Sequence, residues 1–511
     1  MKPIVWSVGL ALLLSPAGRA SEPAVDEIAL AERVRELDAD DYFVRERANQ
    51  ELVKAGQAAI PPLADAAREP GLEKSARAIA ILGQLALSTD VATADAAEQA
   101  LDKLAETEDP RIVGRAKTAL RGRLEVRREA AIARLQQLGA VVPLQEGELL
   151  SVNLSGDTWR GTDEDIQLLR WFPEMTVLVC DGMTCGDEAF AFFGPRMQLA
   201  HLRLLNSKIT ERGFAHLSQL KNLLYFQAEN VPLTDAAMTV LAKMPQLRLL
   251  NLSKTAITDA GFAQVTVFEN LDTLRVEGAS ITDAGMKPLG QLTSLKALEL
   301  KSLPITSAGF QEVARLKNLQ TVRLDSLAID DAGLRPLAEM PSLLALELKH
   351  LPITSAGVEH IASLPQLRML YLKYCPVDEK CLEKLGENTS LSLMYIYGTD
   401  ISMEAADAFS AAHTTVRVDH RMGGFLGVIG AEGVAGCELQ EVQPGMPADQ
   451  AGFRVDDLIT HYGGERVANF DELRALIRKM RAGESVEIRA KRDGEEFTKT
   501  VTLGEEPELG R

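Results

Sequence analysis

The sequence predicts a multidomain chain with three folded regions: an α-helical N-terminal region, a central α/β solenoid of short repeats, and a small C-terminal domain of strands and one helix. The main observation is a segment of the type Ile-Thr-Asp-Ala-Gly, which recurs every 24 residues, for example at Ile257 and Ile281. Apolar residues at helical spacing precede the repeats, and short strand-like runs follow them. A chain of 511 residues is also too long for a single hydrophobic core.

Composition describes a folded protein and excludes one class of partner. Apolar residues make up 46% and charged residues 25% of the chain, as in ordinary soluble domains. The net charge is −18, from 55 basic and 73 acidic residues. Because nucleic-acid binding requires a basic face, we expect no nucleic-acid partner.

The first 20 residues have the pattern of a secretory signal. Lys2 is followed by a short apolar run, and Gly18-Arg19-Ala20 offers small residues at the cleavage positions. The run is too short to span a bilayer stably, although an uncleaved N-terminal anchor is the alternative. We therefore expect an exported protein, located in the periplasm, the cell envelope or the extracellular space, with no integral membrane segment after cleavage.

Residues 24–140 are predicted to be helical. Asp40 or Asp41 can cap one helix, Gly56 ends it, and Pro61-Pro62 opens the next. Asp109-Pro110 marks a further start. The stretch DDYFVRERANQELVKAGQAAIPPL resembles HEAT-type helical repeats.

The central region repeats without insertion over eleven units in the 24-residue frame. The anchors are Gly161, Cys185, Ile209, Leu233, Ile257, Ile281, Ile305, Ile329, Ile353, Val377 and Ile401. Apolar residues seven and five positions before each anchor, such as Leu250 and Leu252, lie on one face of a short strand. The Thr after the anchor is a helix N-cap, and the next residue, usually Asp, favours the positive end of the helix dipole. We interpret this Asp column as capping rather than as a calcium site. The following Gly lets the helix approach the strand.

This pattern resembles the leucine-rich-repeat family, in its helix-bearing, cysteine-containing subclass. The resemblance covers residues 148–415 and implies a curved solenoid with parallel strands on its concave face and helices outside. Two strand columns should face the hollow. From Arg275 to Glu347 and from Glu277 to Lys349 their charges alternate, which fits either a self-paired surface or a charged-ligand site. Toward the C-terminal end of the repeats, these two columns contain aromatic residues. The candidate partner-binding residues there are Tyr371, Lys373, Tyr395 and Tyr397, with packing against the next domain as the alternative.

Residues 421–504 contain five strand-like runs and a predicted helix from Phe470 to Arg481, followed by a tail of residues 505–511. The segments FLGV, VQPGMPADQAGFRVDDLI, GGERV and RDGEE resemble bacterial PDZ domains of exported proteases. The resemblance implies that a peptide C-terminus binds at a glycine-bearing loop and adds as a strand beside the helix. The helix start carries no polar selector, which indicates apolar C-termini. The implied peptide-binding residues are Phe425, Leu426, Gly427, Val428, Leu473, Leu476 and Ile477. A domain used only for packing is the alternative.

The sequence predicts no enzyme. It carries no nucleophile elbow, P-loop, dinucleotide fingerprint or zinc-spaced histidines, so we expect no catalytic residue, metal or cofactor. Of the five cysteines, Cys180 and Cys185, and likewise Cys375 and Cys381, lie close together, while Cys437 stands alone. Export would permit disulfides, but the repeat frame favours buried thiols.

Two functions remain open from the sequence. The first is a scaffold or adaptor in which the repeat arc binds a folded protein and the PDZ-like domain binds a chain terminus. The second is a regulatory or targeting subunit of an envelope proteolytic complex.

Overall fold

The computed structural model describes residues 27–88, 90–145, 148–149, 151–182, 186–191, 193, 197–430 and 437–507. The signal-like segment and Cys185 therefore lie outside the described residues. The chain divides into two compact units, Met1–Ala131 and Ile132–Arg511. Among the described residues, no helix combines the length and apolar character that a membrane crossing needs.

The first unit is helical, as predicted. Asp41 caps its second helix by accepting a hydrogen bond from the Phe43 backbone N–H at 2.7 Å, and Gly56 ends that helix with φ 62°. Leu37, Leu52, Leu63 and Leu82 are fully buried at its core. Its elements are α1 (Glu27–Glu36), α2 (Tyr42–Ala55), η1 (Gly56–Ala59), α3 (Ile60–Arg68), α4 (Leu72–Leu85), α5 (Val91–Ala105) and α6 (Pro110–Gln137), whose last turns belong to the second unit.

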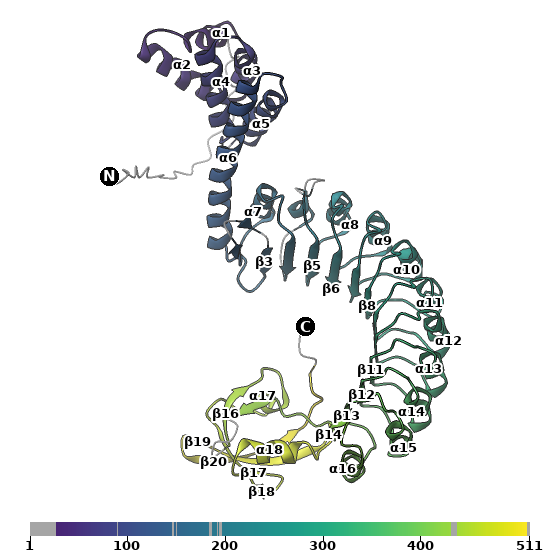
Figure 1. Ribbon diagram of the computed structural model, residues 1–511. Helices are drawn as coiled ribbons and strands as arrows, with labels where there is room; N and C mark the ends of the chain where they lie inside the picture. The colour runs from purple at the N-terminus through teal and green to yellow at the C-terminus, as the bar shows by residue number, and fades with distance from the viewer. Residues whose placement is uncertain are drawn as a thin grey trace. The chain divides into compact units, whose positions relative to one another are not determined.

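The second unit begins with a small antiparallel pair and a long parallel sheet. Twelve strands, β3 to β14, pair in chain order and line the inner side of a curve, with the helices on the outer side (Figure 1). The pair is β1 (Leu144–Gln145) and β2 (Glu148–Leu149). The sheet comprises β3 (Ser151–Ser155), β4 (Val177–Asp181), β5 (His201–Leu205), β6 (Tyr225–Glu229), β7 (Leu249–Ser253), β8 (Thr273–Glu277), β9 (Ala297–Lys301), β10 (Thr321–Asp325), β11 (Ala345–Lys349), β12 (Met369–Lys373), β13 (Leu393–Tyr397) and β14 (Arg417–Arg421).

The outer side carries one short helical segment or pair per repeat, built on the predicted Thr cap. The Thr258 hydroxyl accepts a hydrogen bond from the Ala260 backbone N–H at 3.3 Å, for example. The segments are α7 (Asp163–Ile166), η2 (Gln167–Trp171), η3 (Asp187–Phe190), α8 (Glu211–Phe214), η4 (Ala215–Gln219), α9 (Asp235–Leu241), α10 (Asp259–Phe262), η5 (Ala263–Val267), α11 (Met286–Leu289), α12 (Ser307–Phe310), η6 (Gln311–Arg315), η7 (Asp331–Leu334), α13 (Arg335–Ala338), α14 (Ser355–Ala362), α15 (Cys381–Gly386) and α16 (Met403–Ala412).

The 24-residue frame sets the register of the sheet, with one exception at its start. Leu250 pairs with Leu274, and Leu298 pairs with Val322, each pair being 24 residues apart. In the first repeat, however, Leu154 pairs with Cys180, a step two residues longer than the frame predicts. The loop after β3 holds the buried Trp159, and the backbone N–H that follows it donates to the Leu138 carbonyl. The extra length thus closes the end of the solenoid.

The Asp column lies in the first turn of the helical segments, as predicted, and it also joins neighbouring repeats. Asp259 accepts hydrogen bonds from the Thr282 backbone N–H at 2.7 Å and from the Thr282 hydroxyl at 2.6 Å. Similar paired bonds link Asp187 to Thr210, Asp235 to Thr258, Asp283 to Thr306 and Asp331 to Thr354. Each carboxylate therefore satisfies polar groups at the start of the next helical segment.

The recurring Gly of the repeat has a related cause, which differs from the prediction. A Cβ on Gly261 would overlap the carboxylate of Asp235 in the preceding repeat. The Gly therefore makes room for the inter-repeat Asp rather than for the strand.

Two repeats exchange the partners of this bond. Ser307 occupies the Asp position, and its hydroxyl donates to the Asp330 carboxylate at 2.6 Å, while the Asp330 N–H donates to Ser307 at 3.0 Å. Ser355 and Asp378 repeat the exchange. The acid can therefore come from either of the two bonded repeats, and each of these bonded pairs contains one acid.

The last region of the unit is a sheet with strand order β15-β16-β17-β19-β20 and β18 paired to β17. Its core contains Phe453, Ile459, Phe470 and Ile488. The elements are β15 (Val428–Gly430), β16 (Cys437–Val442), α17 (Pro447–Gln450), β17 (Leu458–Tyr462), β18 (Glu465–Arg466), α18 (Phe470–Ile477), β19 (Ser485–Arg492) and β20 (Glu495–Thr502). Helix α18 is shorter than the predicted Phe470–Arg481.

We predict that swapping the two partners of one inter-repeat bond preserves stability. Asp259→Ser should lower the free energy of unfolding by about 1–3 kcal/mol, because two hydrogen bonds to a carboxylate are lost. Adding Thr282→Asp should restore most of it, because the pair then matches Ser307 and Asp330. Urea denaturation measures both, with the exposed Lys287→Ala as the control. A double variant no more stable than Asp259→Ser would contradict this role.

The Cys180 side chain is buried, and the thiols of Cys375, Cys381 and Cys437 are buried and free. Burial raises the pKa of Cys375 to about 11 and those of Cys381 and Cys437 to about 12. At a pH near 8 these three groups are therefore almost entirely thiols. We expect iodoacetamide to modify them only after denaturation, as measured by mass spectrometry. Rapid labelling of the native chain would show that these sites open.

Candidate functional site

The first candidate site is the outer edge of β15 in the C-terminal sheet. β15 pairs antiparallel with β16 on one side, and in the strand order it stands at the end of the sheet. Within the described part of the chain, no strand pairs with its other side. Such an edge exposes backbone donors and acceptors to which an extended peptide can add.

The loop before β15 contains backbone N–H groups that donate no hydrogen bond to the described residues. Phe425 and Gly504 form a bridge in which each N–H donates to the other's carbonyl, at 2.8 and 3.0 Å. The carbonyls of Leu426 and Gly427 accept from Ala448 and Gln443. Among the described residues, neither the Leu426 nor the Gly427 N–H has a hydrogen-bond partner. Two neighbouring free donors are suited to a carboxylate.

Gly427 determines the shape of this loop. Its φ of 81° lies in the left-handed region, and a Cβ there would overlap the Met446 side chain. Any other residue at this position would therefore displace either the loop or the segment that leads into α17.

The residues of the predicted peptide-binding set lie in the loop, in β15 and in α18, but not all of them line a surface. Leu473 is fully buried and Leu426 is 2% exposed, so both belong to the core. Phe425, Val428, Leu476 and Ile477 are half-buried and keep some surface. The side chains available to a ligand are these four, together with Ile429, which is 42% exposed.

The end of the repeat sheet runs directly into this domain. Met422 follows β14, and its N–H donates to the Arg478 carbonyl at 2.8 Å, while the Gly424 N–H donates to Met480. The Tyr374 hydroxyl donates to the Gly423 carbonyl and accepts from the Glu506 N–H. The chain just after α18 is thus tied by backbone hydrogen bonds to the segment that ends the arc.

The second candidate site is the aromatic end of the concave face. Tyr371 and Tyr395 occupy paired positions on β12 and β13, and their rings stack at 4.7 Å with an interplanar angle of 5°. The Lys373 ammonium lies 5.3 Å from the Tyr371 ring centre and pairs with Glu347 at 2.8 Å. Strand alternation places Met369 and Leu393 on the same face, two positions before the tyrosines. The sequence prediction missed these two residues, although the same period would have found them.

Tyr397 belongs to the interior of this region rather than to its surface. It is 6% exposed, and its hydroxyl donates to Asp419 at 2.8 Å under the guanidinium of Arg421. Burial and the Asp419 hydrogen bond raise the pKa of Tyr397. Burial opposes ionisation of Asp419, but hydrogen bonds from Arg421 and Tyr397 outweigh it and lower the pKa of that carboxyl.

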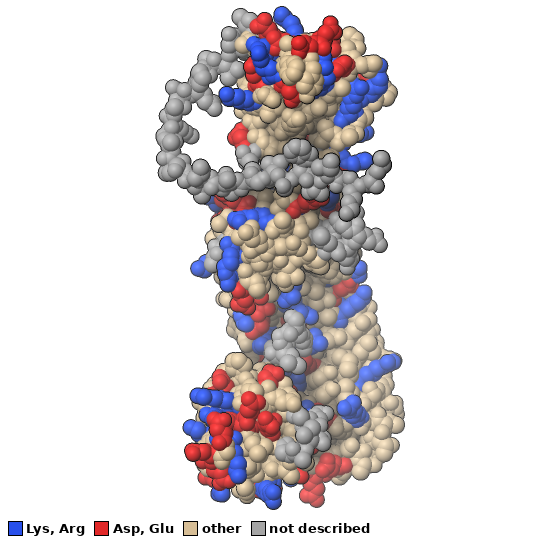
Figure 2. Space-filling view, turned by 90° about the vertical axis from the view of Figure 1, so that its left-hand side faces the viewer, with Lys and Arg blue, Asp and Glu red and all other residues tan. Residues whose placement is uncertain are grey.

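The charged columns of the concave face largely neutralise themselves. Arg323 contacts Glu299 at 3.6 Å and Glu347 at 3.3 Å, and Lys301 contacts Glu277 at 3.4 Å. In Figure 2, basic and acidic side chains are interspersed over the visible part of the repeats. Of the two interpretations left open by the sequence, these contacts favour the self-paired surface.

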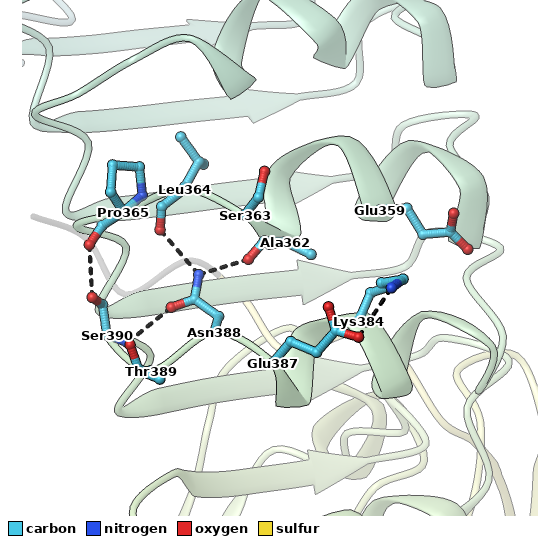
Figure 3. A pocket seen from close by; sticks show the side chains of 10 residues that line it. All are labelled: Glu359, Ala362, Ser363, Leu364, Pro365, Lys384, Glu387, Asn388, Thr389 and Ser390. Atoms are coloured by element: carbon cyan, nitrogen blue, oxygen red, sulfur yellow. Dashed lines mark hydrogen bonds and ion pairs between the residues drawn. The ribbon is translucent and has the colours of Figure 1, made fainter.

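A cavity of about 320 Å³ lies on the helical side, between the segments around α14 and α15 (Figure 3). The Asn388 amide donates to the Ala362 and Leu364 carbonyls, and Ser390 donates to Pro365. Lys384 and Glu387 pair at 3.0 Å near its rim. The Asn388 and Ser390 side chains thus join neighbouring repeats, and we assign the cavity no functional role.

Comparison with known proteins identifies one part of the chain. Residues 439–492 match the family model of PDZ domains. The serine protease Do-like HtrA of Bacillus subtilis is 34% identical over 86 residues, which are 17% of this chain and 19% of the protease. The zinc metalloprotease RasP of Oceanobacillus iheyensis is 35% identical over 80 residues, 16% of this chain and 19% of that protein. The chain thus spans about a fifth of the length of these relatives.

Among solved structures, an internalin, InlF, from Listeria monocytogenes is similar to this chain. It has 18% sequence identity and a TM-score of 0.40, over 57% of this chain and 93% of the internalin. The chain itself combines a helical region, a leucine-rich-repeat solenoid and a small PDZ domain.

The burial of Leu473 leads to a prediction about stability. Leu473→Ala should lower the free energy of unfolding of the PDZ region by about 2–5 kcal/mol, because a fully buried side chain leaves a cavity. Ala475→Ser, at an exposed position of the same helix, should change it by less than about 0.5 kcal/mol. Denaturant titration compares the two. Equal effects would mean that α18 does not pack as described.

Proposed function

We propose that this chain is an exported protein-interaction scaffold whose PDZ domain binds the C-terminus of a partner chain. The free N–H groups of Leu426 and Gly427, next to the unpaired edge of β15, are the observation on which the proposal rests. A terminal carboxylate binds these donors, and the preceding residues add to β15 as a strand. The half-buried Val428 and Ile477 contact the last side chain, which favours an apolar C-terminus. The signal-like residues 1–20 support export.

The repeat arc contributes a second surface in this proposal. Tyr371 and Tyr395, with Lys373 beside them, bind a folded partner through their ring faces and edges. The burial of Tyr397 removes it from this surface. A partner that offers both a tyrosine-binding patch and a free C-terminus would gain affinity from the linkage of the two sites.

A second function, regulation or targeting of an envelope proteolytic complex, is supported by the relatives. The proteins HtrA and RasP that match the PDZ region are proteases, and the match does not extend to the rest of either protein. In this role the partner carries the catalytic residues. Peptide hydrolysis by the purified chain with its partner, but not by the chain alone, would favour this role over a passive scaffold.

The peptide-binding proposal predicts that one substitution in α18 abolishes peptide enrichment. The full chain should enrich peptides with free apolar C-termini from a randomised library. Ile477→Asp should lose the enrichment, because a charge then meets the apolar side chain. Ala475→Asp places the same charge on the exposed side of α18 and should retain it. Failure of the folded wild-type chain to enrich any sequence would contradict the proposal.

The arc surface predicts a separate effect. In a pull-down from envelope extract, a protein retained by the wild-type chain should be lost from the Tyr371→Ala, Tyr395→Ala double variant. Thr321→Ala, elsewhere on the same concave face, should retain it. Equal retention by all three chains would remove the tyrosines from the partner-binding surface.

A further inference from the structure

Arg203, on the concave face, has no partner among the described residues. It lies on β5 and pairs in register with Val179 of β4 and Gln227 of β6. The side chain is half-buried, and its Nε is shielded from solvent. No hydrogen bond or ion pair to another described residue uses the guanidinium. A buried donor of this kind costs free energy unless a ligand satisfies it.

The other arginines of the same column are neutralised within the sheet. Arg275 lies 3.5 Å from the Glu299 carboxylate, and Arg323 lies between Glu299 and Glu347. Arg203 differs because the residues that pair with it in register are a valine and a glutamine. The self-pairing of the concave face therefore does not extend to β5.

Acidic residues lie on the strands next to β5, but they bond elsewhere. Asp181 on β4 and Glu229 on β6 are diagonal to Arg203 in the pairing. Asp181 accepts a hydrogen bond from the Asn206 side-chain amide at 2.9 Å. Glu229 lies 3.6 Å from the Lys254 ammonium. The sheet thus leaves the charge of Arg203 available to a ligand.

The next two residues of the column are amides. Gln227 is half-buried and pairs in register with Asn251. The Asn251 oxygen accepts from the Ser253 backbone N–H at 3.1 Å and from its hydroxyl at 2.6 Å. In the described part of the chain, neither the Asn251 NH2 group nor the Gln227 side chain forms a hydrogen bond. A guanidinium and two amides therefore lie in a row, about 4.8 Å apart from strand to strand.

An aromatic pair flanks this row. His201 and Tyr225 pair in register on β5 and β6, and their rings stack at 4.1 Å with an interplanar angle of 16°. They stand two residues before Arg203 and Gln227, so strand alternation places all four on the same face. Leu249, half-buried on β7, continues the apolar side. The surface thus combines hydrogen-bond donors with an apolar platform.

We infer that Arg203 and the His201–Tyr225 stack bind a protein partner through an acidic side chain that has an apolar residue near it. The carboxylate accepts two hydrogen bonds from the guanidinium, and the apolar residue packs on the rings. Arg203 and His201 are about 7 Å apart along β5, so the two ligand residues lie within about two positions of each other.

The charge of the whole chain narrows the ligand further. The net charge of −18 repels phosphate groups and acidic runs more strongly than a single carboxylate. An isolated Asp or Glu in an apolar context is therefore the favoured ligand.

This surface is separate from the two surfaces of the proposed function. Strands β5 and β6 lie toward the start of the repeat sheet, whereas Tyr371 and Tyr395 lie on β12 and β13 near its end (Figure 1). The inference can fail while both of the other surfaces stand.

The test uses the full chain and a synthetic library of randomised peptides that contains phosphoserine and ends in a C-terminal amide. The amide removes the carboxylate that the PDZ groove is proposed to bind. The wild-type chain should enrich peptides with Asp or Glu within two positions of a large apolar residue. Arg203→Met should lower this enrichment about tenfold, because charge-assisted hydrogen bonds are lost.

Arg323→Met is the matched control, because it makes the same change in the same column at an arginine that Glu299 and Glu347 neutralise. It should retain the enrichment. Arg203→Met removes no ion pair with a described residue, so the midpoint of its urea denaturation should match that of the wild type. Loss of binding by this variant is then not a loss of folding.

Four outcomes would overturn the inference. They are no selection of acidic residues by the folded wild-type chain, equal selection by Arg203→Met, an equal loss in Arg323→Met, and a preference for phosphoserine over Asp and Glu. The last of these would assign the site to a phosphate group instead of a carboxylate.

Discussion

The hydrogen bond between an acid and a residue of the neighbouring repeat, one of which precedes a helical segment, is the constraint on which the solenoid depends. A single strand and helical segment cannot bury its own apolar face, so each repeat is stable only when it is stacked. The bond from Thr282 to Asp259 specifies how the stack is aligned on its helical side. On the other side, parallel pairing of strands such as β8 and β9 specifies the same alignment. Because both contacts recur every 24 residues, the concave face has continuous columns of side chains.

This alignment determines what the arc presents. Charged residues in the middle columns face opposite charges on adjacent strands, as Arg323 does between Glu299 and Glu347. The same columns bring Tyr371 against Tyr395 at the end of the arc. From there β14 leads through Met422 into the PDZ domain, where hydrogen bonds hold the chain against the end of α18. The two candidate binding surfaces therefore belong to one continuous run of backbone contacts.

Much of this arrangement could be predicted from the sequence, because the relevant contacts repeat with a fixed period. The Thr caps, the leucines of the core and the side-chain columns of the concave face follow from local spacing alone. The partner of each Asp could not be predicted, because it lies in the next repeat and the residue is equally suited to the first turn of a helix. The two-residue offset of β3 from the 24-residue frame could not be predicted either, because it depends on how Trp159 closes the stack.

In the PDZ domain, too, contacts between distant residues could not be predicted from local spacing. The sequence pattern marks Leu426 and Leu473 together with Val428 and Ile477, but only packing separates core residues from surface residues. The burial of Tyr397 depends likewise on Asp419 and Arg421, which follow the last predicted repeat. A Cβ on Gly430 would meet the Phe470 ring, but the two residues are far apart in sequence, and nothing in their local spacing indicates this contact.

The most direct test of the account is the affinity of one library-selected peptide in two forms, with a free C-terminal carboxylate and with a C-terminal amide. If the N–H groups of Leu426 and Gly427 bind the carboxylate, isothermal titration calorimetry should give a dissociation constant at least about tenfold weaker for the amide, because hydrogen bonds to a charged group are lost. Equal affinities would contradict the account, because the peptide would then bind without using the end of its chain.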